Sequence, residues 1–170
     1  MNDNIHPEEA IILLKASCPE NVIAHCKTVS RLAKRIAEKI RSSGHKVDVD
    51  FVETAALLHD IGRGVTHGIR HGIEGSDILR DHPEYARVCR NHLGGGIDRN
   101  EAAELGLPSG DYIPETLEEK IICYADKLVD GEKEITIDES LEKFRQRLGP
   151  DHPSVDRIRR MHEEIQSLMC

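Results

Sequence analysis

The sequence predicts an all-α fold, with a single domain over residues 1–170. Apolar side chains recur at helical spacing in most segments, as Val22, Val29, Leu32 and Ile36 do. A chain of 170 residues with 38% hydrophobic residues is long enough to bury one full core without disulfide bonds. No internal repeat, low-complexity stretch or linker divides it.

The N-terminal part predicts three helices. The first spans 7–17, with a proline at its first position and acidic residues in its first turn. The second spans about 20–41 and ends at a Ser-Ser-Gly sequence. The third starts after Asp48 or Asp50, either of which is a suitable N-cap, and ends near Gly62.

The middle of the chain predicts shorter helices. A loop over 62–70 precedes a helix over about 71–81. A further helix runs from Pro83 to a run of three glycines. A helical turn over 100–106 then leads into a loop over 108–115, which we expect to border the functional site.

Three helices complete the chain. Thr116 and Glu119 predict a capping box for the helix that carries Asp126. The last two helices span about 138–148 and 153–169. The apolar face of the final helix predicts packing on the core, and a homodimer interface is the alternative.

Charge and cysteine spacing narrow the class of protein. A net charge of −8 argues against non-specific nucleic-acid binding, which requires a basic face. The five cysteines lack the spacing of a disulfide framework, which indicates reduced thiols in a cytoplasmic protein. No apolar run approaches the length of a membrane span, and the N-terminus lacks a signal-peptide pattern, so no membrane partner is expected.

Ionisable residues interrupt the apolar faces of three predicted helices. His25 shares a face with core aliphatic residues, the doublet His59–Asp60 ends an apolar run, and Asp126 shares a face with Ile122. A single inward histidine is readily satisfied by a backbone carbonyl group. Several ionisable groups facing one core require a shared partner, and a metal ion suits both imidazole and carboxylate.

The order of these residues resembles the HD-domain superfamily of metal-dependent phosphohydrolases. The segments LLHDIGR at 57–63 and YADKLVD at 124–130 are similar to motifs of that superfamily, and the likeness covers about 20–132. The resemblance implies an HD-type helical bundle, with the helices of 138–169 beyond the motif core. It also implies that one divalent metal is bound by His25, His59, Asp60 and Asp126.

Two further histidines suggest a second metal. His71 opens the segment HGIEGSDIL, which resembles the second-site segment of binuclear HD enzymes, and His92 closes a predicted helix. The resemblance implies that Asp60 bridges both ions. His67 is an alternative ligand to His71. Without a metal, His71 would be a solvated helix-start residue and His92 a buried residue near a helix end. The other histidines are expected on the surface: His6, His45, His82, His152 and His162.

The chain departs from the cyclic-dinucleotide phosphodiesterases of the superfamily in one respect. Those enzymes have a His-His pair and a Gly-Tyr-Pro segment where this chain has His92-Leu93 and three glycines. The departure argues against cyclic-dinucleotide cleavage. It also implies a second metal with fewer protein ligands, completed by water.

The predicted ligands favour one or two divalent transition metals per chain, namely Mn, Fe, Zn, Ni or Co, with Mg as a further option. Such ions generate a nucleophile from water and stabilise charge on phosphoryl oxygens, so no protein nucleophile is required. Asp60 is then catalytic as the bridging ligand. Arg63 and Lys127, which follow ligands closely in the sequence, are expected to contact a substrate phosphate, with Arg70 a weaker candidate.

These observations predict a hydrolase that cleaves a phosphate ester or anhydride of a small, nucleotide-like substrate. The alternative is a metal-containing nucleotide-binding or sensor module without turnover. A decayed sensor is expected to lack one of the four ligands of the first metal, and none is missing here. The segment before Asp126 is similar to bacterial diadenosine tetraphosphate hydrolases, while a nucleotidase is also consistent with the motifs.

Overall fold

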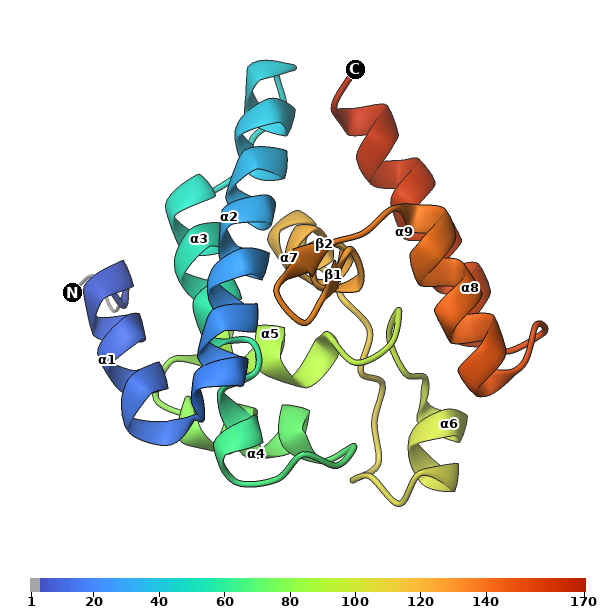
Figure 1. Cartoon of the computed structure of the whole chain (residues 1–170), viewed down its shortest axis with the longest axis horizontal. Helices are drawn as coiled ribbons and strands as arrows, with labels where there is room; N and C mark the ends of the chain where they lie inside the picture. The colour runs from blue at the N-terminus through green and yellow to red at the C-terminus, as the bar shows by residue number, and fades with distance from the viewer. Residues whose placement is uncertain (1–3) are drawn as a thin grey trace.

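The computed structural model describes residues 4–170. Nine α-helices, a 3₁₀ helix and a two-stranded hairpin make up this part of the chain (Figure 1). The helices are α1 (Pro7–Ser17), α2 (Glu20–Ser42), α3 (Val49–Leu58), α4 (His71–Ile78), α5 (Pro83–Asn91), α6 (Arg99–Glu104), α7 (Leu117–Lys127), α8 (Ile137–Leu148) and α9 (Pro153–Leu168). The 3₁₀ helix η1 covers Ile61–Gly64, and the hairpin consists of β1 (Val129–Asp130) and β2 (Lys133–Glu134). The predicted all-α fold class is confirmed.

The core is built where α2 packs against α3 and α7. Val29, Ala33 and Ile36 of α2 are buried, as their helical spacing predicts. Helix α7 adds Ile121 and Ile122, which are fully buried. Each large aliphatic side chain contributes about 1.5–3 kcal/mol when it is buried. This packing holds the three helices that carry His25, His59 and Asp126 in one arrangement.

The predicted bounds of α1 and α2 agree with the structure to within one residue, whereas α3 ends at Leu58 rather than near Gly62. Helix α3 begins after Asp48, whose carboxylate accepts a hydrogen bond from the Phe51 amide at 3.0 Å, so Asp48 rather than Asp50 is the N-cap. The sequence does not predict the hairpin, in which Val129 pairs with Glu134. Strands of two residues are too short to show an alternating pattern.

The capping box predicted at the start of α7 is half formed. The Thr116 hydroxyl accepts a hydrogen bond from the Glu119 amide at 3.1 Å, as expected. The buried Glu119 carboxylate instead accepts hydrogen bonds from Arg87, Asn91 and the Glu115 amide. Glu119 therefore joins α5 to α7, because a buried carboxylate is stable only when polar groups surround it.

The two C-terminal helices lie side by side, and α9 also packs on α7 (Figure 1). Ile158 and Ile165 of α9 are buried, which confirms core packing for its apolar face. A homodimer stays a prediction. Within residues 4–170, no helix combines the length and the apolar character that crossing a membrane requires.

Gly62 lets η1 approach α4 closely. A Cβ atom on Gly62 would lie 1.9 Å from the His71 carbonyl oxygen and 2.5 Å from the Gly75 amide nitrogen. The prediction that the doublet lies at the C-terminal end of a helix is confirmed, because His59 is the C-cap of α3. Gly62 follows inside η1 without a positive φ, so a left-handed backbone is not what requires glycine there. The position requires glycine because two backbone segments meet there.

We expect Gly62→Ala to lower the free energy of unfolding by about 1–3 kcal/mol, because the methyl group would force η1 and α4 apart. Urea unfolding followed by circular dichroism measures the change. Gly68→Ala is the matched control, since a Cβ atom there meets only the Thr66 hydroxyl, at 3.5 Å. Equal stabilities for the two variants would contradict this account of Gly62.

Candidate metal centre

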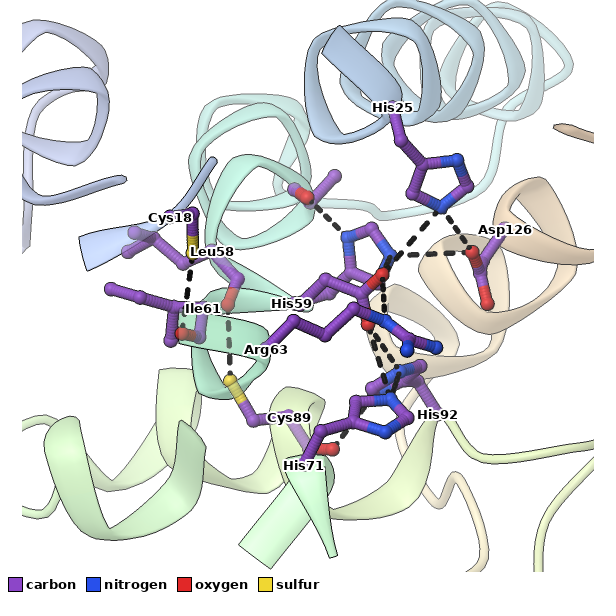
Figure 2. A network of polar contacts seen from close by, with 12 residues as sticks. Cys18, His25, Leu58, His59, Ile61, Arg63, His71, Cys89, His92 and Asp126 are labelled. Carbon is purple, nitrogen blue, oxygen red and sulfur yellow. Dashed lines mark hydrogen bonds and ion pairs between the residues drawn. The ribbon is translucent and has the colours of Figure 1, made fainter. Parts of the chain in front are cut away.

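Six ionisable side chains from five helical segments meet between the helices. His25 comes from α2, and His59 and Asp60 follow the last residue of α3. The other three are His71 at the start of α4, His92 at the end of α5 and Asp126 in the last turn of α7. Figure 2 shows His25 and Asp126 on one side of the group, His71 and His92 on the other, and His59 between them. The structure thus brings together every residue that the sequence predicts as a metal ligand.

Asp126 joins two of the histidines in a first cluster. Its Oδ1 atom lies 2.9 Å from Nε2 of His25 and 3.2 Å from Nε2 of His59. Oδ2 of Asp60 lies 3.7 Å and 3.6 Å from the same two nitrogen atoms. The ligand atoms of His25, His59 and Asp126 all lie within 4.8 Å of one another, close enough to bind a single ion, and Asp60 borders this group.

The second oxygen of Asp60 faces a second cluster. Oδ1 lies 3.2 Å from Nε2 of His71 and 3.1 Å from Nε2 of His92. These two nitrogen atoms are themselves 3.2 Å apart. Each oxygen of Asp60 therefore faces its own pair of histidines, an arrangement that suits a carboxylate bridging two ions.

Backbone carbonyl groups orient all four imidazoles. The Nδ1 atoms of His25, His59, His71 and His92 lie 2.7, 2.6, 2.9 and 2.7 Å from the carbonyl oxygens of Gly131, Ala56, Gly68 and Cys89. A carbonyl oxygen only accepts, so each Nδ1 must carry the hydrogen. In a neutral ring, Nε2 then presents a lone pair toward the cluster. This is the tautomer that a metal ligand requires.

The contacts of His92 show that these residues fit a cation. Burial lowers the pKa of His92 to about 4, although the hydrogen bond to Asp60 acts in the opposite direction. The ring is therefore neutral at pH 7, and its Nε2 lone pair faces Oδ1 of Asp60 and Nε2 of His71. The lone pair of His92 and the Asp60 carboxylate repel one another unless a proton or a cation lies between them. The donor set and its protonation state thus both suit a metal ion.

The two carboxylates are ionised, although Asp60 is buried and Asp126 is partly buried. Burial alone would raise the pKa of Asp60, but the charge of His59 and a hydrogen bond from His71 hold it well below its ordinary value. Burial likewise acts to raise the pKa of Asp126, and Lys127 and His59 hold it well below the ordinary value. Burial acts to lower the pKa of His25, but Asp126 outweighs it and raises the pKa to about 9. A metal that binds His25 must displace a proton.

Lys127 is a buried cation between the two clusters. Its Nζ donates to Oδ2 of Asp126 at 2.7 Å and to the His92 carbonyl oxygen at 2.8 Å. Burial acts to lower the pKa of Lys127, but Asp126 outweighs it and raises the pKa. Asp126 is thereby oriented with Oδ1 toward the first cluster.

Arg63 is half-buried beside the doublet. Its Nε donates to Oδ2 of Asp60 at 3.0 Å, and its Nη1 donates to the His67 carbonyl oxygen at 3.3 Å. The His67 side chain is exposed. His71, by contrast, is buried with its Nε2 beside Asp60, so the structure places His71 rather than His67 at the candidate second site.

The cluster opens into a cavity of 610 Å³. His25, Asp60, His71, His92 and Asp126 all line it, as do Arg63, Lys127 and the His67 segment. The loop over 108–115 does not line this cavity, so its expected place beside the site is wrong. That loop instead exchanges backbone hydrogen bonds with Ile97 through the buried Tyr112.

Helix α8 supplies a wall of the cavity that the sequence does not predict. Lys143, Phe144 and Arg147 line it, and so does His152, which follows α8 and was expected to be a surface residue without a role. The only signal in the sequence is that the α8 residues share one helical face. Ordinary packing produces the same spacing, so only the fold shows that this face meets the cavity.

Several known proteins are similar to this chain. A model of the HD domain family matches residues 22–130. An uncharacterized protein of Methanocaldococcus jannaschii is 47% identical over 165 residues, which cover 95% of this chain and 98% of that protein. A tRNA (cytidine(56)-2'-O)-methyltransferase of Picrophilus torridus is 36% identical over 165 residues. That match covers 95% of this chain but 46% of the methyltransferase, so the chain corresponds to about half of that relative.

A solved structure agrees with the family match. The HD domain of the L. monocytogenes phosphodiesterase PgpH, in complex with cyclic-di-AMP, aligns with a TM-score of 0.54 and 19% identity. The alignment covers 94% of each chain. At this identity the likeness shows the fold alone. The match of the family model, which covers more than half of the chain, shows that this protein belongs to the HD domain family.

Proposed function

We propose that the protein is a metal-dependent phosphohydrolase that acts on a small, nucleotide-like substrate. HD domains bind divalent metals, and the His/Asp cluster has the composition to hold one. The observation that carries the proposal is the position of Asp60, whose two oxygens each face a pair of histidines at 3.1–3.7 Å. Such a carboxylate is suited to hold two ions at the distance that phosphoryl transfer uses.

We assign the ligands to two sites that share Asp60. The first ion would be held by His25, His59, Asp126 and Oδ2 of Asp60. The second would be held by His71, His92 and Oδ1 of Asp60. Imidazoles equal the carboxylates in number at the first site and outnumber them at the second, and this share of imidazole favours Mn, Fe, Zn, Ni or Co over Mg. Fewer protein ligands at the second site leave room for water or substrate.

When bound, two such ions would lower the pKa of a water molecule and offset charge on the phosphoryl group. The protein's own residues hold this ligand set in place. Backbone carbonyl groups orient the imidazoles, and Lys127 orients Asp126. Arg63 has the more exposed cation and faces the cavity, so we assign it to the substrate phosphate. A direct contact between Lys127 and the substrate stays a prediction.

The size of the cavity supports a nucleotide-like substrate. Its 610 Å³ lies within the range of about 300–1,000 Å³ that small-molecule sites occupy. The HD domain of PgpH was crystallised with cyclic-di-AMP, which shows that this fold accepts a nucleotide in that protein. The glycines after His92 serve packing here, because a Cβ atom on Gly95 would lie 2.9 Å from Cβ of Arg157 in α9. The chain also has His92-Leu93 where the cyclic-dinucleotide phosphodiesterases of the superfamily have a His-His pair, so we favour a mononucleotide or dinucleoside polyphosphate over a cyclic dinucleotide.

A nucleotide-binding or sensor module without turnover is the second candidate. Arg63 supports this candidate. Its Nε donates a hydrogen bond to Oδ2 of Asp60, so the charge of Arg63 offsets part of the charge of Asp60, and the cluster needs fewer metal ions to be stable. Both candidates contain a metal, and the complete ligand set favours the hydrolase, because none of the four predicted ligands of the first metal is missing. Turnover distinguishes the two candidates.

We expect purified protein to release phosphate or a nucleotide from at least one compound in a panel supplied with Mn, Fe, Co, Ni, Zn or Mg in turn. The panel contains phosphomonoesters, mononucleotides, dinucleoside polyphosphates and a cyclic dinucleotide. Asp60→Ala should reduce the rate by about 100-fold or more, because it removes a ligand of both ions. Nucleotide binding without turnover of any compound would instead support the sensor.

Elemental analysis should show two transition-metal ions per chain in the parent protein after dialysis against metal and removal of the excess. The His92→Ala variant should lose one ion, because Nε2 of His92 lies beside Oδ1 of Asp60, the oxygen assigned to the second site. Asp60→Ala should lose both, while circular dichroism shows that the helices persist. Retention of both ions by Asp60→Ala would exclude a bridging role, and a parent protein that takes up no metal would exclude the hydrolase.

Lys127→Met should weaken metal binding about 10–100-fold, because Oδ2 of Asp126 would lose its buried partner and Oδ1 its orientation. Titration of chelator-treated protein with Mn or Zn measures the affinity. The control is Lys120→Met, which removes a lysine of the same helix that pairs with Glu164 away from the cluster. Unchanged affinity in Lys127→Met would leave the substrate-contact role as the one to test.

A further inference from the structure

The cavity extends well beyond the metal cluster. Its outer walls come from α6, α8 and the segment before α4. Three of the large hydrophobic residues that are exposed in this protein line these walls: Ile69, Leu105 and Leu148. Exposed aliphatic side chains gathered around one opening mark a binding surface. This outer part of the cavity has no role in holding a metal.

One face of α8 forms much of the outer wall. Its lining residues are spaced three or four apart, so they lie in one row along the helix: Ser140, Lys143, Phe144, Arg147 and Leu148. Helix α8 follows the residues 22–130 that match the family model. Part of the outer wall thus comes from a segment beyond the residues that match the family model.

Phe144 and Arg147 form a stacked pair on this face. Cζ of Arg147 lies 4.7 Å from the centre of the Phe144 ring. Lys143 pairs with Asp130, whereas none of the carboxylates in residues 4–170 forms an ion pair with Arg147. Phe144 is half-buried and packs against Leu141, Val155 and Ile158, which hold its ring in place. A fixed aromatic ring and an unpaired guanidinium therefore face the cavity together.

We propose that Phe144 and Arg147 bind the base of the substrate nucleotide, while its phosphate lies at the metal cluster. This inference rests on the proposed function for the position of the phosphate. Bases stack on aromatic rings and on guanidinium planes, and each such contact is worth enough to select a ligand. The aliphatic side chains of Leu105, Leu148 and Ile69 would cover the edges of the base.

The chemistry of the wall favours a base over other ligands. A purely apolar ligand would bury Arg147 without a partner, which is costly. A sugar phosphate without a base would leave the aliphatic side chains and the Phe144 ring exposed to water. A base avoids both costs. Its faces are apolar and cover the Phe144 ring and the aliphatic side chains, while its ring nitrogen and carbonyl groups accept hydrogen bonds from Arg147.

The test compares ligands with and without a base on the metal-loaded protein. The probes are AMP, GMP, CMP, UMP and ribose 5-phosphate, titrated by calorimetry, with chromatography to show whether each nucleotide stays intact. For a nucleotide that is turned over, the KM replaces the dissociation constant. We expect at least one nucleotide to bind the parent protein at least tenfold more tightly than ribose 5-phosphate.

Arg147→Ala and Phe144→Leu should each weaken binding of that nucleotide about fivefold or more and leave ribose 5-phosphate unchanged. Phe144→Leu keeps the apolar contacts of the ring and so protects the fold. Arg145→Ala is the matched control, because Arg145 belongs to the same helix, pairs with Glu142 and does not line the cavity. It should behave as the parent protein does.

Two results would overturn the proposal. One is that no nucleotide binds more tightly than ribose 5-phosphate. The other is that both variants bind the preferred nucleotide as well as Arg145→Ala does. The hydrolase proposal fails separately: a base preference lost in the two variants, without turnover of any compound, would keep the base site and reject hydrolysis. Turnover without any base preference would support hydrolysis and reject the base site.

Discussion

The structure depends on one shared carboxylate. Asp60 is buried, and each of its two oxygens is contacted by two imidazole nitrogens from different helical segments. Moving a charge into a core is costly unless the surrounding groups compensate for it. Here four imidazoles and Arg63 supply that compensation, and a metal would supply more. The helices α2, α3, α4, α5 and α7 must therefore keep their relative positions, because each contributes a group to this one cluster.

Backbone groups fix the positions of the side chains in the site. Carbonyl groups, rather than flexible side chains, accept the Nδ1 hydrogens of all four histidines. Gly62 brings η1 against the start of α4 and thereby sets the distance between Asp60 and His71. Groups held by the backbone lose little conformational freedom when a ligand binds, and this is what a preorganised site requires.

Charges of both signs line the cavity. Its four cations are Arg63, Lys127, Lys143 and Arg147, and its five carboxylates are Asp60, Glu101, Glu104, Asp126 and Asp130. Three of the cations contact a lining carboxylate: Arg63 contacts Asp60, Lys127 contacts Asp126 and Lys143 contacts Asp130. Arg147 instead lies over the Phe144 ring. The cation that is free to meet a negatively charged or polar ligand is therefore the one on the α8 wall.

The sequence by itself determined the helices and the inward direction of His25, His59 and Asp126, because a period of 3.6 residues is a local property of the chain. Only the tertiary structure decided which oxygen of Asp60 faces which histidines, that His71 rather than His67 lies beside it, and that α8 lines the cavity. It also decided that Gly62 serves a close approach and that Glu119 joins two helices. Each of these features is a contact between segments that are separate in the sequence. Spacing along one helix carries no information about what packs against it.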